Sequence, residues 1–156
     1  MTELTQGERG ARTWSDDEER ALRLWIAMAR AYATVARAIS SKVAEYGLTA
    51  PQFGILEALH HLGPLPLGEL AEKLLVTGGN VTYVMDRLEG LGLVERCRSE
   101  ADRRVVTAHL TDEGRALVTE VFPGHASYIA GLLDTLDAEE QNTARELLKR
   151  LGKGIG

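Results

Sequence analysis

The chain has 156 residues, of which 44% are hydrophobic and 26% are charged, and its formal net charge at pH 7 is −5. This length is enough for one globular domain with a substantial core. The sequence has no run of 18 or more apolar residues, so no membrane span is predicted. The N-terminus is polar and does not resemble a secretory signal. The single cysteine, Cys97, excludes an internal disulfide, so we expect a cytoplasmic protein.

A long first helix is predicted over residues 14–47, because apolar residues recur there at every third or fourth position. Ser15 and Glu18 have the spacing of a capping box at its start, and Gly47 is the expected stop. Residues 1–13, which precede this helix, are polar, and we expect them to form a mobile arm.

Three shorter helices are predicted next. Thr49 is the expected cap of the first, and the segment 63–66, with two prolines, ends it. The second covers residues 67–75. The third is expected to begin at Thr77 and to end at Gly92.

Two strands follow, at residues 93–98 and 105–110, and a charged loop joins them. Thr111 is the expected cap of a fifth helix, and Pro123-Gly124 should bend or break it. A further capping box at Asp137 begins the last helix.

The predicted order is therefore ααααββαα, a mainly helical fold with a small β-hairpin. It places a winged helix-turn-helix at residues 48–111, between an N-terminal helix at 14–47 and C-terminal helices at 112–156. The flanking helices are apolar along one stripe and cannot all cover the small winged-helix core. We therefore expect a homodimer in which these terminal helices interdigitate.

The helix that begins at Thr77 is the candidate DNA-reading element, because the second helix of a helix-turn-helix enters the major groove. Asn80 and Arg87 can read bases, and the adjacent glycines let backbone amides approach phosphates. The alternative is a buried helix with a solvated polar face; the neighbouring helix and the following hairpin favour DNA. The candidate residues are Thr77, Gly78, Gly79, Asn80, Thr82, Tyr83 and Arg87.

The loop between the two strands is the second candidate DNA contact. It contains Asp102, Arg103 and Arg104, and Arg98 lies on the preceding strand. An arginine at a hairpin tip can enter a narrow minor groove, and a neighbouring aspartate can hold the guanidinium. Taken alone, this loop is better explained as a solvated charged hairpin.

The segment from residue 48 to residue 115 resembles the MarR family of bacterial transcriptional regulators. The resemblance implies a homodimer that binds a pseudo-palindromic operator, usually as a repressor. It also implies that a small ligand, often a phenolic or aromatic acid, or an oxidant releases the protein from the DNA. By match to the family's wing motif, Asp102 and Arg104 are expected at the DNA, with Arg103 beside them. The pieces that carry the resemblance are Gly68-Glu-Leu-Ala71, the helix at 77–91, Gly92-Leu-Val-Glu-Arg96, Asp102-Arg-Arg104 and Leu110-Thr-Asp-Glu-Gly114.

The resemblance also implies an effector pocket between the winged helix and the dimer helices. The alternative for its aromatic residues is a place in the core, and for the arginines a solvated stripe. Adjacent His60 and His61 are not expected to place both rings on one helix face. No cofactor is expected beyond a small aromatic or phenolic effector. The candidate lining residues are Trp25, Met28, Arg30, Tyr32, His60 and His61.

Other functions have less support. Cys97 in a strand reads as an inert small hydrophobe, and the histidines as surface or partly buried side chains, because no cluster has metal-ligand spacing. A metal- or thiol-triggered regulator is therefore a weaker alternative. No catalytic motif indicates an enzyme. The remaining alternative is a winged-helix protein-interaction module that binds no DNA, which the net acidity and the pair Asp86 and Glu89 beside Arg87 support.

Overall fold

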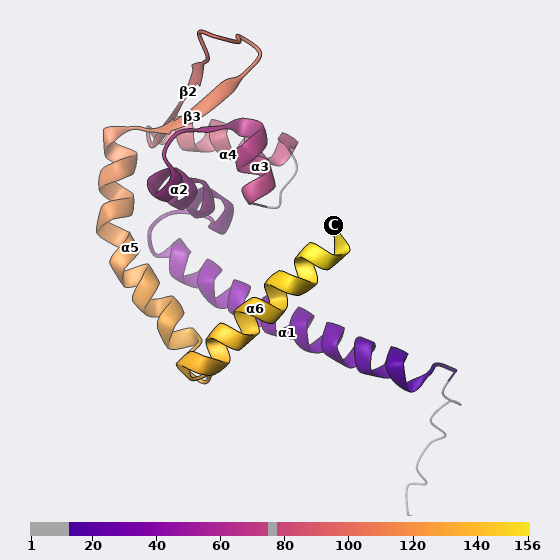
Figure 1. Cartoon of the computed structure of the whole chain (residues 1–156). Coiled ribbons are helices and arrows are strands. Elements are labelled where there is room, and N and C mark those ends of the chain that lie inside the picture. Colours follow the sequence, from indigo (N-terminus) through magenta and orange to yellow (C-terminus); the bar gives the residue numbers. More distant parts are fainter. Residues whose placement is uncertain (1–12, 75–77) are drawn as a thin grey trace, which may run out of the picture. The chain divides into compact units, whose positions relative to one another are not determined.

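The computed structural model describes residues 13–74 and 78–156 (Figure 1). It confirms a mainly helical fold with a small antiparallel sheet, whose strand order is β1-β3-β2. The predicted helices and the hairpin are all present, and one short strand is added. The elements are α1 Asp16–Ala44, α2 Ala50–Leu62, β1 Leu65–Pro66, α3 Leu67–Lys73, α4 Gly78–Gly90, β2 Val94–Arg98, β3 Val106–Leu110, α5 Asp112–Leu132 and α6 Ala138–Ile155.

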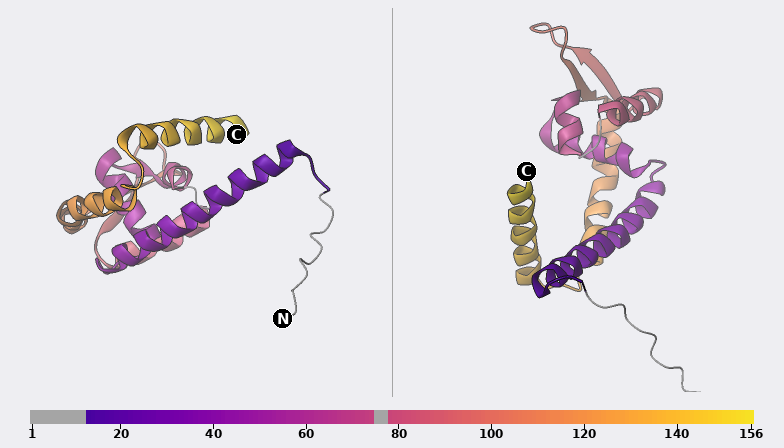
Figure 2. Two further views of the ribbon diagram at one scale, coloured as in Figure 1. Left: turned by 90° about the horizontal axis from the view of Figure 1, so that it is seen from below. Right: turned by 90° about the vertical axis from the view of Figure 1, so that its right-hand side faces the viewer.

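The chain divides into two compact units, Met1–Arg37 and Ala38–Gly156, at a point inside α1. The described part of the first unit is mostly helical and largely exposed. The second unit contains the sheet and the winged helix, and its β2–β3 hairpin extends away from helices α2, α3 and α4 (Figures 1 and 2). Among the described residues, no helix is both long and apolar enough to cross a membrane. The predicted arm at residues 1–13 lies almost wholly outside the described residues.

Side-chain caps fix the starts of several helices, as the sequence predicts. In a capping box, the cap side chain accepts from the third residue of the helix, whose side chain accepts from the cap backbone. Asp137 and Glu140 form both bonds at 2.9 Å. The same reciprocal pairs form between Ser15 and Glu18 before α1, and between Thr49 and Gln52 before α2.

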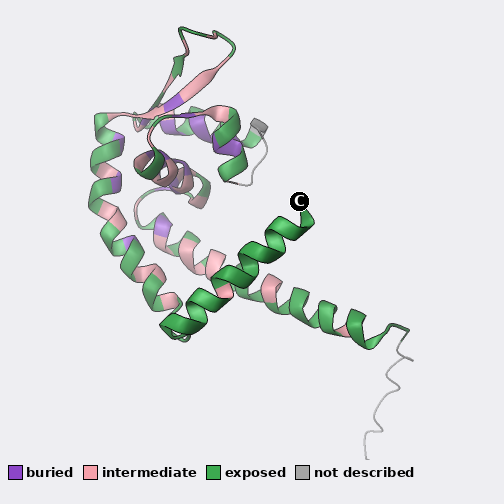
Figure 3. Cartoon of the chain, viewed as in Figure 1, coloured by how far each residue is buried: buried purple, intermediate pink, exposed green. Residues whose placement is uncertain are grey.

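The core of the second unit lies where α2, α3, α4 and α5 meet the sheet. Figure 3 shows buried residues on these elements and none on α6. The inward face of α4 carries Val81, Val84, Met85 and Leu88, whereas Leu91, just after the helix, is 55% exposed. The largest fully buried side chains are Ile55, Leu56, Leu70, Met85, Leu88, Val43, Val81 and Val118.

A third strand, β1, occupies the segment that was expected only to end α2. Leu65 pairs with Ala108 of β3, and Pro66 pairs with Thr107. Pro66 has no N–H to give to a sheet, but an edge strand tolerates this loss. Two residues show no periodicity, so only the pairing with distant β3 reveals this strand.

Helix α5 is not broken at Pro123, contrary to one outcome that the sequence suggested. The helix runs from Asp112 to Leu132 with Pro123 inside it. Proline removes one backbone hydrogen bond, the one to the carbonyl four residues earlier. Val118 and His125, on either side of Pro123, are both buried, so packing on the core supports the helix across the missing bond.

The start of α5 is joined to the base of the hairpin by a close backbone approach. Thr111 accepts from the Gly114 N–H at 3.0 Å and donates its hydroxyl to the Gly92 carbonyl at 2.7 Å. A Cβ atom on Gly114 would collide with the Leu93 carbonyl oxygen and would lie 2.9 Å from its carbonyl carbon. Glycine at 114 is therefore required by space.

Candidate nucleic-acid interface

Helix α4 presents a polar face to solvent opposite its buried one. The N-terminal part of this face carries Asn80, Thr82 and Tyr83, all exposed. The Arg87 guanidinium lies 5.9 Å from the centre of the Tyr83 ring, one helical turn away, which favours a cation–π contact. The exposed face thus offers amide, hydroxyl, phenol and guanidinium groups.

The start of α4 matches the prediction as far as the structure describes it. Gly78 and Gly79 form the first turn of the helix. Thr77, the expected cap, lies outside the described residues, so its role stays a prediction. The first-turn glycines carry no side chain that would keep a phosphate from the backbone amides.

Arg96 of β2 is bound to α4, a contact that the sequence analysis did not find. Its guanidinium donates to Glu89 and to Asp86, each at 2.7 Å, and to the Thr82 carbonyl at 3.0 Å. Its backbone N–H donates to the second oxygen of Glu89 at 2.9 Å. Both carboxylates near Arg87, which had favoured a protein-interaction module, are therefore paired with Arg96 within the fold. The tight turn at Gly92, between Glu89 and Arg96, is the one sequence signal for this contact.

The tip of the β2–β3 hairpin holds an exposed arginine in a fixed orientation. Asp102 accepts from the Arg104 backbone N–H at 3.0 Å and from its guanidinium at 3.2 and 3.3 Å. These hydrogen bonds hold the pKa of the Asp102 carboxyl below its usual range. The Arg104 side chain is 91% exposed, so its charge remains available to a partner.

The remaining predicted wing residues are also exposed. Arg98 ends β2 and Arg103 lies in the loop, and within the described ranges neither forms an ion pair. Cys97 lies in β2, as predicted, and its side chain is exposed, so it does not pack as a buried hydrophobe. Edge strand β2 pairs with β3 alone in the sheet, and its Arg96 N–H donates to Glu89 of α4.

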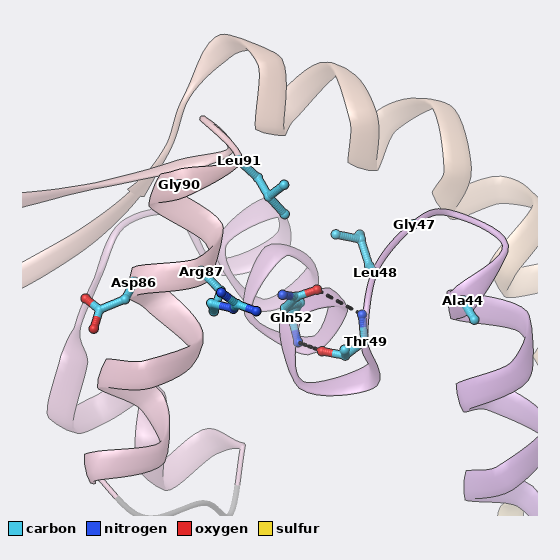
Figure 4. Close-up of a pocket in the computed structure, with 9 residues that line it drawn as sticks. All are labelled: Ala44, Gly47, Leu48, Thr49, Gln52, Asp86, Arg87, Gly90 and Leu91. Atoms are coloured by element: carbon cyan, nitrogen blue, oxygen red, sulfur yellow. Dashed lines mark hydrogen bonds between the residues drawn. The ribbon is translucent and has the colours of Figure 1, made fainter.

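A hollow of about 650 Å³ separates the start of α2 from the second half of α4 (Figure 4). Arg87 and Gln52 point into this hollow, whereas Asp86 points away from it. The positive end of the α2 dipole and the Arg87 charge therefore face the same space. An anionic group such as a phosphate would meet a favourable potential there.

The predicted effector residues divide between the two units. Met28, Trp25, Arg30 and Tyr32 belong to the first unit, where Trp25 is 62% exposed and Tyr32 is 78% exposed. Neither aromatic ring is a core residue within its unit. His60 and His61 belong to the second unit, and the effector pocket as a whole stays a prediction.

His60 and His61 both reach the same aromatic ring, contrary to the expectation for adjacent helical residues. Their ring centres are 5.1 Å apart, and they lie 6.3 and 4.6 Å from the centre of Phe122. Neighbouring residues diverge by about 100° around a helix, but Phe122 of α5 contacts both rings. The two histidines therefore share one partner.

His125 completes a group that we call the aromatic–histidine cluster: Tyr46, Phe53, His60, His61, Phe122 and His125. His125 is only 2% exposed, although it was read as a surface or partly buried side chain. Its ring centre is 4.5 Å from that of Phe53. Its position seven residues after Val118, on the apolar face of α5, is the signal that was missed.

Three polar atoms in this cluster are buried without a hydrogen-bond partner among the described residues. They are Tyr46 Oη, His60 Nδ1 and His125 Nδ1. Such atoms are uncommon in protein interiors because each one has lost its hydration. The part of the chain that the structure describes holds no group of three His, Cys, Asp or Glu side chains able to bind a metal ion.

Comparison with known proteins identifies the family. Residues 48–106 match the family model described as the MarR family. The HTH-type transcriptional regulator MhqR of Bacillus subtilis is 37% identical over 134 residues, which cover 86% of this chain and 92% of MhqR. This chain belongs to the MarR family of transcriptional regulators. The resemblance predicted from the sequence is confirmed.

Solved structures of MarR-family regulators show the same winged-helix fold. Sco3205 of Streptomyces coelicolor, solved in complex with DNA, has a TM-score of 0.82 and 25% identity, over 92% of this chain and 94% of Sco3205. BpsR of Bordetella bronchiseptica, whose DNA binding is described as regulated by 6-hydroxynicotinic acid, has a TM-score of 0.76 and 28% identity, over 83% of this chain and 98% of BpsR.

Proposed function

We propose that this MarR-family regulator binds a pseudo-palindromic operator in double-stranded DNA as a homodimer and represses transcription. The N-terminal part of α4 reads the major groove, and the β2–β3 loop enters the flanking minor groove. The observation that carries this proposal is the pairing of an exposed polar face on α4 with Arg104, which Asp102 orients at the hairpin tip. The DNA complex of Sco3205 supports it.

An uncovered apolar face on α6 supports the homodimer. This helix has no buried residue, and its exposed apolar side chains include Leu147, Leu148, Leu151 and Ile155. A surface helix of a monomer turns such a face to its own core, and apolar patches left in the open mark interaction sites. A second copy of the chain covers this face and brings two copies of α4 to one operator.

A small aromatic or phenolic effector is proposed to release the DNA. The aromatic–histidine cluster supports this class of ligand, because its buried polar atoms can hydrogen-bond a hydroxyl or carboxylate while its rings pack on an aromatic ligand. BpsR, which responds to 6-hydroxynicotinic acid, is similar to this chain. The effector shifts the population towards a dimer whose recognition helices no longer fit the operator.

The test is binding of the purified protein to a labelled fragment from upstream of its own gene, at physiological salt. We expect a complex that survives excess unrelated DNA and that weakens steeply as salt rises. A folded dimer without sequence-specific binding would overturn the proposal and favour the protein-interaction module. Phenolic and aromatic acids added to the complex should dissociate it; zinc, a chelator and peroxide, added separately, test a metal or thiol trigger.

A further inference from the structure

Arg96 joins three positions along one face of the helix that is proposed to read DNA. Thr82, Asp86 and Glu89 are spaced by four and three residues, so they lie in one row on α4. Arg96 donates to all three from the neighbouring strand, at 2.7 to 3.0 Å. A single rotation and height of α4 relative to β2 satisfies all of these bonds together.

Arg96 is held through both its guanidinium and its backbone N–H, unlike a residue in an ordinary surface ion pair. Its side chain is 23% exposed, whereas those of Asp86 and Glu89 are 59% and 33% exposed. The Arg96 backbone N–H also donates to Glu89 at 2.9 Å, so one carboxylate binds both the side chain and the main chain of the same residue. A planar guanidinium can make this forked contact, and a lysine ammonium cannot.

The strand that carries Arg96 continues directly to the hairpin tip. Residues 94–98 of β2 pair in register with β3, and the Ser99 N–H donates to the Val105 carbonyl at 3.0 Å. The next residues hold the Asp102–Arg104 pair. Fixing the angle between α4 and β2 therefore also fixes the distance between the exposed face of α4 and Arg104.

Charge gives Arg96 a second effect. The described part of α4 carries two acidic residues, Asp86 and Glu89, and one basic residue, Arg87. With Arg96 the four charges sum to zero. Without it, α4 would carry a net charge of −1 near the phosphates of bound DNA, at a cost in affinity.

We propose that Arg96 is a positioning residue for DNA recognition. It locks the orientation of α4 relative to the hairpin and, together with Arg87, balances the charges of Asp86 and Glu89, and it makes no contact with DNA itself. The inference rests on the proposed function, because it assigns a role within the same interface. It also separates Arg96 from Arg98, which is two residues further along β2 and is exposed.

The test is a double-mutant cycle between Arg96→Gln and the neutralising pair Asp86→Asn with Glu89→Gln. Affinity is measured by fluorescence anisotropy on the upstream fragment and on an unrelated fragment of equal length, below the unfolding temperature of every variant. We expect Arg96→Gln to weaken fragment binding by about 30-fold in the native background and by no more than about threefold in the neutralised one, a coupling typical of contacting groups. In the native background, Arg96→Gln should also lower the preference for the upstream fragment over the unrelated fragment.

Arg98→Gln is the matched control, because it removes the same charge from the same strand. As a direct DNA contact it should cost the same factor in both backgrounds. Arg96→Lys, which keeps the charge but not the fork, should recover only part of the affinity, and it replaces Arg96→Gln in the cycle if that variant does not fold.

An equal cost of the Arg96 substitution in both backgrounds would overturn the inference, as would an altered thermal stability with an unchanged preference between the fragments. The proposed function fails on different data: the native protein would then show no preference for the upstream fragment before any variant is compared.

Discussion

Single residues with unusual demands on space or charge decide how the hairpin is attached to the rest of the second unit. Thr111 bonds both the first turn of α5 and the Gly92 carbonyl. Gly92 itself has a φ of +72°, in the left-handed region that favours glycine. The Thr111–Gly114 motif thus ends the sheet and starts α5 in the same few residues.

Replacing Gly114 by alanine should destabilise the fold. The new Cβ atom would collide with the Leu93 carbonyl, and overpacking of this kind costs about 2–3 kcal/mol. The measurement is thermal unfolding at a fixed protein concentration, since a dimer's unfolding temperature depends on concentration. Gly131→Ala is the control: it lies in the same helix with nothing within 4 Å of the added atom and should leave stability unchanged or raise it slightly. Equal effects of the two substitutions would contradict the close approach.

The Asp102 carboxyl should titrate below 3.8, the usual pKa value for this group, because Arg104 hydrogen-bonds its ionised form. A lowered folded-state pKa means that the contact is intact above 3.8 and is lost as the pH falls through the lower folded value. Carboxyl NMR titration measures the midpoint. In Arg104→Gln the midpoint should return towards 3.8; an unchanged midpoint would show that Arg104 is not its cause.

Local signals were the predictable part of the molecule at this scale. The caps at Thr49, Thr111 and Asp137 involve residues three apart, so the sequence contains both partners of each bond. Arg96 and His125 escaped prediction because their partners come from other elements. The sequence around Arg96 does not show that its carboxylate partners lie on the preceding helix, where Glu89 is seven residues earlier.

Whole elements give the proposed interface its shape: α4 presents an exposed polar face proposed for base edges, and the hairpin presents the Arg104 charge proposed for the minor groove. Strand β1, at two residues, could not be predicted because its existence depends on pairing with β3 across more than forty positions of sequence. In helix α5, Pro123-Gly124 predicted a bend or a break, and the break does not occur because the helix packs on the core on both sides of Pro123. Periodic segments were predictable, and features fixed by distant partners were not.

Truncating a key residue of α4 and one of the β2–β3 hairpin should change DNA binding in different ways. Arg104→Ala should weaken binding to operator and unrelated DNA alike and reduce the slope of log affinity against log salt by about 0.9, the value for one lost phosphate contact. Asn80→Ala should instead reduce the preference for the operator, by about 1–3 kcal/mol if it contacts a base. Anisotropy titrations on both fragments at several salt concentrations measure this. An Arg104→Ala protein that binds as tightly as the native one would refute the wing assignment.

At the scale of the whole molecule, the proposed dimer supplies what one chain lacks. In the proposed function one copy of α4 reads only a half-site, and α6 has no buried residue in the single chain (Figure 3). Sequence periodicity predicted this apolar stripe, but one chain cannot show its partner surface. The family membership is consistent with this interpretation, and the oligomeric state remains a proposal to be measured.

A charge placed on the apolar face of α6 should separate the protomers. Leu151→Glu is expected to shift sedimentation from dimer to monomer and to weaken operator binding, because an unpaired carboxylate at an apolar interface is costly to desolvate. Asn142→Glu adds the same charge nine residues earlier, about 180° around α6 on its exposed polar side, and should leave the dimer intact. A Leu151→Glu protein that sediments as the native one would exclude this face from the interface.

The most direct test of the account is a hydroxyl-radical footprint of the native protein on the fragment from upstream of its gene. A homodimer with α4 in the major groove and the hairpin in the minor groove predicts two symmetric half-sites, centred about one helical turn or a multiple of it apart. Protection should extend into the flanking minor grooves where Arg104 lies. A single asymmetric footprint, or none from a folded dimer, would contradict it.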